Sequence, residues 1–128
     1  MGAAKQLVIV VDDDLQIRES LESLLKSAEF SAAAFSSAED VLHSGLLTKA
    51  SCLITDVRMR GIQGVELQRR LKCQYPSLPV IIITAYRDDR IRQSALSDGA
   101  AFFLYKPFDP NDLLGAVHSS ICESAKDE

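Results

Sequence analysis

The chain has 128 residues, a length that suits one folded unit with its own apolar core, so we expect residues 1–128 to form a single domain. Its formal net charge of −4 provides no general attraction to nucleic acid or to an anionic membrane. No apolar run reaches the roughly 20 residues that span a bilayer, and residues 1–6 lack a secretory signal, so we expect a cytoplasmic protein.

Short β-branched runs alternate with helical periodicity along the chain, which is the pattern of an α/β fold with a parallel sheet. Strands are predicted over residues 7–11, 32–35, 52–56, 80–83 and 101–105. The first strand is apolar without alternation, as expected for a strand that is covered on both faces. The second is weakly hydrophobic, which favours an edge position.

Helices are predicted between these strands. The first three are indicated by apolar spacing or by a helix-start signal: Ile17 to Leu25, Ser37 with Asp40, and Val65 to Leu71. A fourth, over 88–97, offers only Ile91, Ala95 and Leu96 for burial and should be the least firmly anchored. The last helix begins with Asp109 as N-cap and Pro110 at its first position.

Four of the predicted strands end in residues suited to phosphoryl chemistry, namely Asp12 with Asp13, Asp56, Thr84 and Lys106. Ligands bind at the carboxyl ends of the strands in an open parallel sheet, so we expect these side chains to share one shallow pocket. Three adjacent carboxylates repel one another and need a proton or a cation at neutral pH. Oxygen ligands favour Mg2+, which together with Lys106 would balance the three negative charges.

Asp56 stands alone at the end of its strand and is the best candidate for a carboxylate nucleophile that forms an acyl phosphate. Phosphoryl transfer places negative charge on the equatorial oxygens, which Mg2+, Lys106 and the Thr84 hydroxyl would meet. Each of these residues alone also fits an ordinary role in a turn, a helix cap or a solvated surface. Their occurrence at successive strand ends favours the functional interpretation.

Several stretches together make the chain resemble the receiver domain of two-component response regulators: VIVVDDD, ITDVRM followed by GVELQRRLK, VIIITAY, and DGAAFFLYKPF. The resemblance covers nearly the whole chain. It implies a three-layer, doubly wound, five-stranded parallel sheet in the order 2-1-3-4-5, as in flavodoxin and chemotaxis receivers. It also implies a signalling domain, not an enzyme in its own right, that takes a phosphoryl group from a sensor histidine kinase.

The resemblance assigns site roles to individual residues. It implies that Asp56 is the phosphoacceptor and that Asp12 and Asp13 are the acidic pair that binds Mg2+ with it. The backbone carbonyl of Arg58 would complete the metal site. The segment from ITDVRM to GVELQRRLK looks most like receivers that precede a helix-turn-helix domain. This favours transcriptional control through a DNA-binding domain in a longer protein over a complete single-domain regulator, with no nucleic-acid contact by the receiver itself.

The resemblance also implies a conformational switch. Thr84 and Lys106 would contact the phosphoryl group, and the Lys106-Pro107 bond is commonly cis in the family. Thr84 would move toward the phosphoryl oxygens while Phe103 turns inward, although Phe103 also fits a plain core role. The helix over 88–97, the strand over 101–105 and the last helix would form the output face, through which phosphorylation could produce a homodimer.

Two departures from the family pattern affect the site. Arg60 stands where the family often has proline, which indicates a more mobile loop. Tyr86 lies two residues beyond Thr84, and Arg58 lies two residues beyond Asp56. Both would flank the phosphoryl group and could hinder or guide attacking water. We therefore predict a longer-lived phosphorylated state than in receivers with small or acidic residues at these positions.

Two other functions stay open at this point. A small phosphohydrolase of the haloacid dehalogenase type also uses a strand-end aspartate, but it usually needs a second acid at the position that Arg58 occupies here. A receiver-like interaction module that is never phosphorylated is the other.

Overall fold

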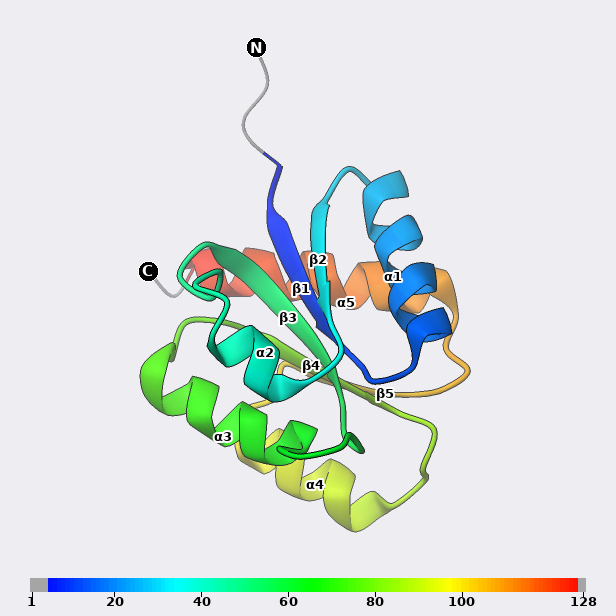
Figure 1. The fold of residues 1–128 in the computed structure, drawn as a ribbon, viewed down its shortest axis with the longest axis vertical. Coiled ribbons are helices and arrows are strands. Elements are labelled where there is room, and N and C mark those ends of the chain that lie inside the picture. The colour runs from blue at the N-terminus through cyan, green and yellow to red at the C-terminus, as the bar shows by residue number, and fades with distance from the viewer. Residues whose placement is uncertain (1–4, 127–128) are drawn as a thin grey trace.

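Five parallel strands form a single sheet in the order β2-β1-β3-β4-β5 in the computed structural model, which describes residues 5–126 (Figure 1). The strands are β1 (Leu7–Val11), β2 (Ser31–Phe35), β3 (Ala50–Asp56), β4 (Val80–Thr84) and β5 (Phe102–Tyr105). Five helices alternate with them: α1 (Leu15–Ser27), α2 (Ala38–Leu42), α3 (Gly64–Gln74), α4 (Asp89–Ser97) and α5 (Pro110–Lys126). The predicted fold class and strand order are confirmed.

The central strands are buried because their side chains are apolar on both faces. All five residues of β4 are buried, and β1 is buried from Val8 onward. Every residue of β2 is only half-buried, which agrees with its predicted edge position. β2 and β3 begin slightly earlier than the sequence predicted, because Ser31 and Ala50 both pair with Leu7 of β1.

The helices cover the sheet in two layers. Helices α2, α3 and α4 pack on one face together with Ile9, Leu53 and Ile82 of the sheet. Helices α1 and α5 pack on the other face, against the neighbouring strand residues Val10 and Ile54 (Figure 1). Successive strand side chains therefore enter opposite cores, as the period of a β-strand requires.

The helix ends follow the local signals. Ser37 Oγ accepts a hydrogen bond from the Asp40 amide at the start of α2, and Asp109 Oδ1 accepts one from the Asn111 amide at the start of α5. Asp88 caps α4, and Gly99 follows that helix with φ +101°. The caps predicted at Ser37 and Asp109 are confirmed, whereas Asp88 was predicted as the first helical residue and instead caps α4. None of the helices within residues 5–126 has the length and apolar character needed to cross a membrane.

Candidate functional site

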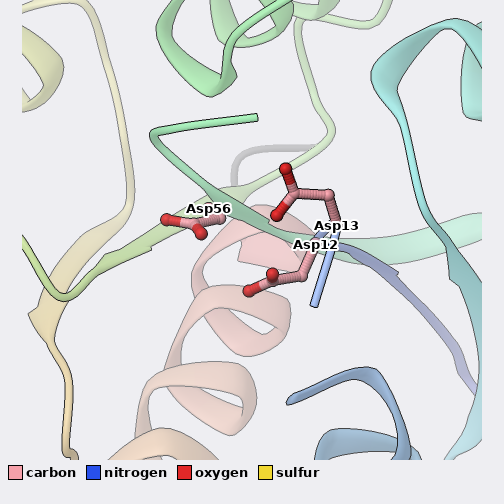
Figure 2. A group of neighbouring side chains, drawn as sticks. All are labelled: Asp12, Asp13 and Asp56. Atoms are coloured by element: carbon pink, nitrogen blue, oxygen red, sulfur yellow. The ribbon is translucent and has the colours of Figure 1, made fainter. Parts of the chain in front are cut away.

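Three carboxylates gather at the carboxyl edge of the sheet (Figure 2). Asp12 and Asp13 follow β1, and Asp56 ends the adjacent strand β3. Val11 pairs with Thr55, so the register of these two strands brings the three acids together. One oxygen from each lies within 4.8 Å of the others, and Asp12 and Asp56 are buried while Asp13 is exposed.

Lys106 brings a positive charge to this acidic cluster from the end of β5. Its Nζ donates to Asp12 Oδ2 at 3.0 Å and to Asp56 Oδ2 at 3.2 Å, and only 15% of the Lys106 side chain is exposed. The Lys106 amide donates to the Thr84 carbonyl at 2.8 Å, and the Lys106-Pro107 bond is cis, as the resemblance implied. One ammonium against three carboxylates leaves two negative charges, which suits a divalent cation held by oxygen atoms.

Burial controls the electrostatics of this pocket. It raises the pKa of Asp56, as does the charge of Asp12, although Lys106 and a hydrogen bond from the Arg58 amide oppose the rise. Burial alone would lower the pKa of Lys106, but its hydrogen bonds to Asp12 and Asp56 and their negative charges outweigh that effect and raise it. In the absence of a metal, the ionised Asp56 carboxylate is therefore destabilised and the Lys106 ammonium is stabilised.

Replacing Asp56 with asparagine is expected to increase the free energy of unfolding at pH 7 in EDTA. The folded-state pKa of Asp56 lies above its unfolded value of about 3.9, so the ionised carboxylate opposes folding once the pH exceeds both values. Below about pH 4 the carboxyl group is protonated in both states, and the advantage of asparagine should disappear. Urea unfolding of both proteins from pH 3 to pH 7 tests this, and an advantage that does not change with pH would contradict it.

Thr84 lies at the end of β4 with 2% of its surface exposed. Its Oγ1 accepts a hydrogen bond from the Tyr86 amide at 3.1 Å. The Tyr86 ring is exposed, and the Arg58 guanidinium lies 3.8 Å from the ring centroid. This cation–π contact joins the loop after β3 to the loop after β4, the two loops that follow Asp56 and Thr84. The sequence placed both residues beside the site but did not predict that they stack on each other.

Phe103 lies in the core on the α2, α3 and α4 side of the sheet, where it pairs with Ile82 of β4. Its ring packs edge to face against the Tyr105 ring, with the two ring centroids 5.5 Å apart. Phe102 packs into the opposite core, as strand alternation requires. The Tyr105 hydroxyl donates to Asp89 Oδ1 of α4 at 3.2 Å. The structure thus places Phe103 beside the elements of the expected output face, and its role as a switch stays a prediction.

A cavity of about 420 Å³ lies at the end of the sheet opposite the acidic cluster, where the strands begin. Its walls include Gln6, Ala50 and Leu78, which stand at or just before the amino ends of β1, β3 and β4. No charged side chain lines it among the described residues. The acidic cluster, which combines opposite charges with buried oxygen ligands, is therefore the stronger candidate for phosphoryl chemistry.

Comparison with known proteins agrees with this geometry. Residues 8–118 match the family model described as the response regulator receiver domain. A response regulator receiver domain protein from Clostridium thermocellum superposes with a TM-score of 0.90 at 25% identity, covering 96% of this chain and 99% of that one. The response regulator StyR superposes with a TM-score of 0.88 at 38% identity, covering 97% of this chain and 63% of StyR.

Curated relatives include regulators of transcription. The transcriptional regulatory protein FixJ of Azorhizobium caulinodans is 40% identical over 119 residues, which are 93% of this chain and 56% of FixJ. The transcriptional regulatory protein TdiR of Thauera aromatica is 38% identical over 114 residues, 89% of this chain and 50% of TdiR. This chain thus spans about half the length of the curated relatives that it matches. With its fold, its strand-end acids and these similarities, it belongs to the receiver domain family of two-component response regulators.

Proposed function

We propose that Asp56 accepts a phosphoryl group from a sensor histidine kinase in a Mg2+-dependent reaction, and that this modification changes the face formed by α4, β5 and α5. The observation that carries the proposal is the pair of hydrogen bonds from the Lys106 ammonium to Asp12 and Asp56, beside the third carboxylate of Asp13. On this proposal the domain is a phosphoacceptor that assists its own phosphorylation and dephosphorylation, not an enzyme with a separate substrate.

The donor atoms of the pocket fit the proposed metal ion. Asp12, Asp13, Asp56 and the backbone carbonyl of Arg58 would supply oxygen ligands, the kind that Mg2+ prefers. When bound, Mg2+ supplies charge neutralisation for the incoming phosphoryl oxygens. This ligand set leaves Lys106 free to turn from the carboxylates toward the phosphoryl group.

Covalent chemistry in this proposal is confined to Asp56. A carboxylate oxygen of Asp56 forms a bond to phosphorus while the bond from phosphorus to the kinase histidine breaks, and the electron pair leaves with that histidine nitrogen. Lys106 and the Thr84 hydroxyl donate to the equatorial oxygens, where charge develops. Thr84 Oγ1 can still accept from the Tyr86 amide while it donates its own proton, so its movement would carry the loop after β4 along.

The proposed phosphorylation can be tested by intact mass after incubation with a small-molecule phosphodonor. We expect one phosphoryl group to be added with Mg2+, none with EDTA, and none on Asp56→Asn with either. Asp40→Asn, which alters an exposed acid of α2, serves as the matched control and should behave like the unmodified chain. If no adduct forms and no phosphate is released from the donor, the domain is an interaction module that works without phosphorylation.

We expect the contact between Arg58 and the Tyr86 ring to slow dephosphorylation of Asp56. Removing the ring with Tyr86→Ala should free Arg58 and open the approach of water to the phosphoryl group. We expect dephosphorylation to become about two- to fivefold faster, the equivalent of the ~0.5–1 kcal/mol of an exposed cation–π contact. Tyr86→Phe keeps the ring and should keep the original rate. An unchanged rate in Tyr86→Ala would contradict the idea.

The wider role that we propose is control of transcription in the cytoplasm. It is supported by relatives named as transcriptional regulators, of which this chain matches about half. DNA would be contacted by another domain of such a protein, because the net charge of −4 gives the receiver no electrostatic attraction to nucleic acid.

Phosphorylation is also proposed to produce a homodimer through α4, β5 and α5. The supporting observation is opposite charge on this face: Arg87 lies just before α4 and Arg90 and Arg92 lie on it, while Asp109 and Asp112 lie at the start of α5. Light scattering should show a doubled mass when beryllium fluoride and Mg2+ mimic the phosphoryl group, and the Arg90→Glu variant should stay monomeric. The same mass with and without the mimic would count against the dimer.

A further inference from the structure

Glu39, near the start of α2, makes a contact that joins it to the loop between β3 and α3. Its Oε2 accepts a hydrogen bond from the Ile62 amide at 3.2 Å, across 23 residues of sequence. Its Oε1 is buried and has no hydrogen-bond partner among the described residues. A carboxylate oxygen in that situation costs free energy, so the contact is not simply that of a solvated surface acid.

Two glycines shape the loop that Glu39 contacts. Gly61 has φ +75°, and a methyl group added there would overlap the Glu39 carboxylate. At the far end of the loop, the Gly64 amide donates to the Val57 carbonyl at 2.9 Å, and a methyl group at Gly64 would overlap the backbone carbonyl of Asp56. The loop therefore leaves Asp56, turns against Glu39 and returns to Asp56.

The same loop carries Arg58, whose backbone amide donates to the Asp56 carboxylate. The loop is thus hydrogen-bonded to Asp56 of the site through Arg58 and, only four residues later, to Glu39 of α2 through Ile62. Arg60 lies between these two points and is exposed. A hydrogen bond to Glu39 limits the freedom of this segment, and so opposes the mobility that the absence of a proline at position 60 suggested.

We propose that Glu39 is a positioning residue for the metal site: by holding the Ile62 amide, it fixes the loop that presents the Arg58 backbone to Asp56 and to the cation. This inference rests on the proposed function, because it names the support of the same site. Residues that orient metal ligands from outside the ligand set commonly affect metal affinity by about 10–100-fold when they are removed.

The experiment compares Glu39→Ala and Glu39→Gln with the unmodified chain, and Asp40→Ala serves as the matched control. Asp40 is the next residue of α2 and is exposed, so its variant removes the same charge without removing the bond to Ile62. Two quantities are measured without a phosphodonor: the Mg2+ dissociation constant by calorimetric titration, and the hydrogen-exchange rate of the Ile62 amide by NMR.

Glu39→Ala is expected to weaken Mg2+ binding about tenfold and to accelerate exchange of the Ile62 amide. Glu39→Gln keeps an oxygen that can accept from Ile62 and should remain within about twofold of the unmodified chain in both quantities, as should Asp40→Ala. Rescue by glutamine separates the hydrogen bond from the charge, because alanine and glutamine both remove the negative charge.

The possible results separate failure of this inference from failure of the proposed function. A Mg2+ dissociation constant for Glu39→Ala within twofold of the original overturns it, and so does equal weakening in all three variants. If the unmodified chain binds no Mg2+, the metal site of the proposed function is wrong. The exchange rate of the Ile62 amide then decides whether Glu39 holds the loop: an unchanged rate in Glu39→Ala overturns this, and a faster rate supports it. Normal Mg2+ binding without phosphorylation contradicts the proposed function alone.

Discussion

Phosphorylation of the Lys106→Met variant should be at least about 100-fold slower than that of the unmodified chain, the size of effect that follows loss of one donor to developing negative charge. Methionine keeps most of the length of the side chain but removes the ammonium that lies 3.0 Å from Asp12 and 3.2 Å from Asp56. Mg2+ binding should not weaken, because the carboxylate oxygens that now accept from Lys106 become available to the metal. A loss of reaction without a loss of metal affinity is thus the expected signature.

The same variant should be less stable in EDTA. Removing one partner of a buried ion pair leaves its carboxylates uncompensated and costs about 3–5 kcal/mol of unfolding free energy. Mg2+ should restore much of that loss, because it replaces the missing positive charge. Lys49→Met, which makes the identical change at an exposed lysine, should alter neither rate nor stability appreciably. Rates near the original in Lys106→Met would remove Lys106 from the proposed mechanism.

Gly64→Ala is expected to destabilise the fold by about 1–3 kcal/mol, because the added methyl group would overlap the Asp56 carbonyl, a backbone atom that cannot rotate away. Either α3 must shift or the strand end that carries Asp56 must move, so Mg2+ binding should weaken as well. Urea unfolding and a Mg2+ titration measure the two effects.

Gly115→Ala is the matched control for that substitution. Gly115 lies inside α5, where a methyl group would meet no atom within 4 Å, and alanine in a helix is favoured over glycine by about 0.5–1 kcal/mol. It should therefore be more stable than the unmodified chain, while Gly64→Ala is less stable. Equal effects of the two substitutions would show that the close approach at Gly64 does not matter.

The strands and helix caps could be predicted from sequence because their causes are local. A continuous apolar run such as Val80 to Ile83 is typical of a central strand, and Ser37 and Asp109 each accept a hydrogen bond from an amide within three residues of themselves. The convergence of Asp12, Asp13 and Asp56 followed from the parallel sheet alone, because that topology places every strand end at one edge.

Contacts between side chains of different elements could not be predicted in this way. The bond from Ile62 to Glu39 depends on the path of a loop with φ +75° at Gly61, which residue spacing does not specify. Gln68 is another example: it is buried on α3 and its Nε2 donates to the Ala95 carbonyl of α4 at 2.8 Å. Helical periodicity identified Leu67 and Leu71 as the inward positions but gave no sign of a buried amide beside them.

The division of the core into two sides has a consequence for how a signal would spread. Phe103 shares its core with α3 and α4, whereas α5 and α1 pack around Phe102 and the other strand residues of the opposite face. The sheet lies between α3 and α4 on one side and α1 on the other (Figure 1). A rearrangement of Phe103 would therefore disturb the packing of α4 directly and leave that of α1 intact. The Phe103 rearrangement would then reach α4 directly, while α1, on the far side of the sheet, would act as a stationary support.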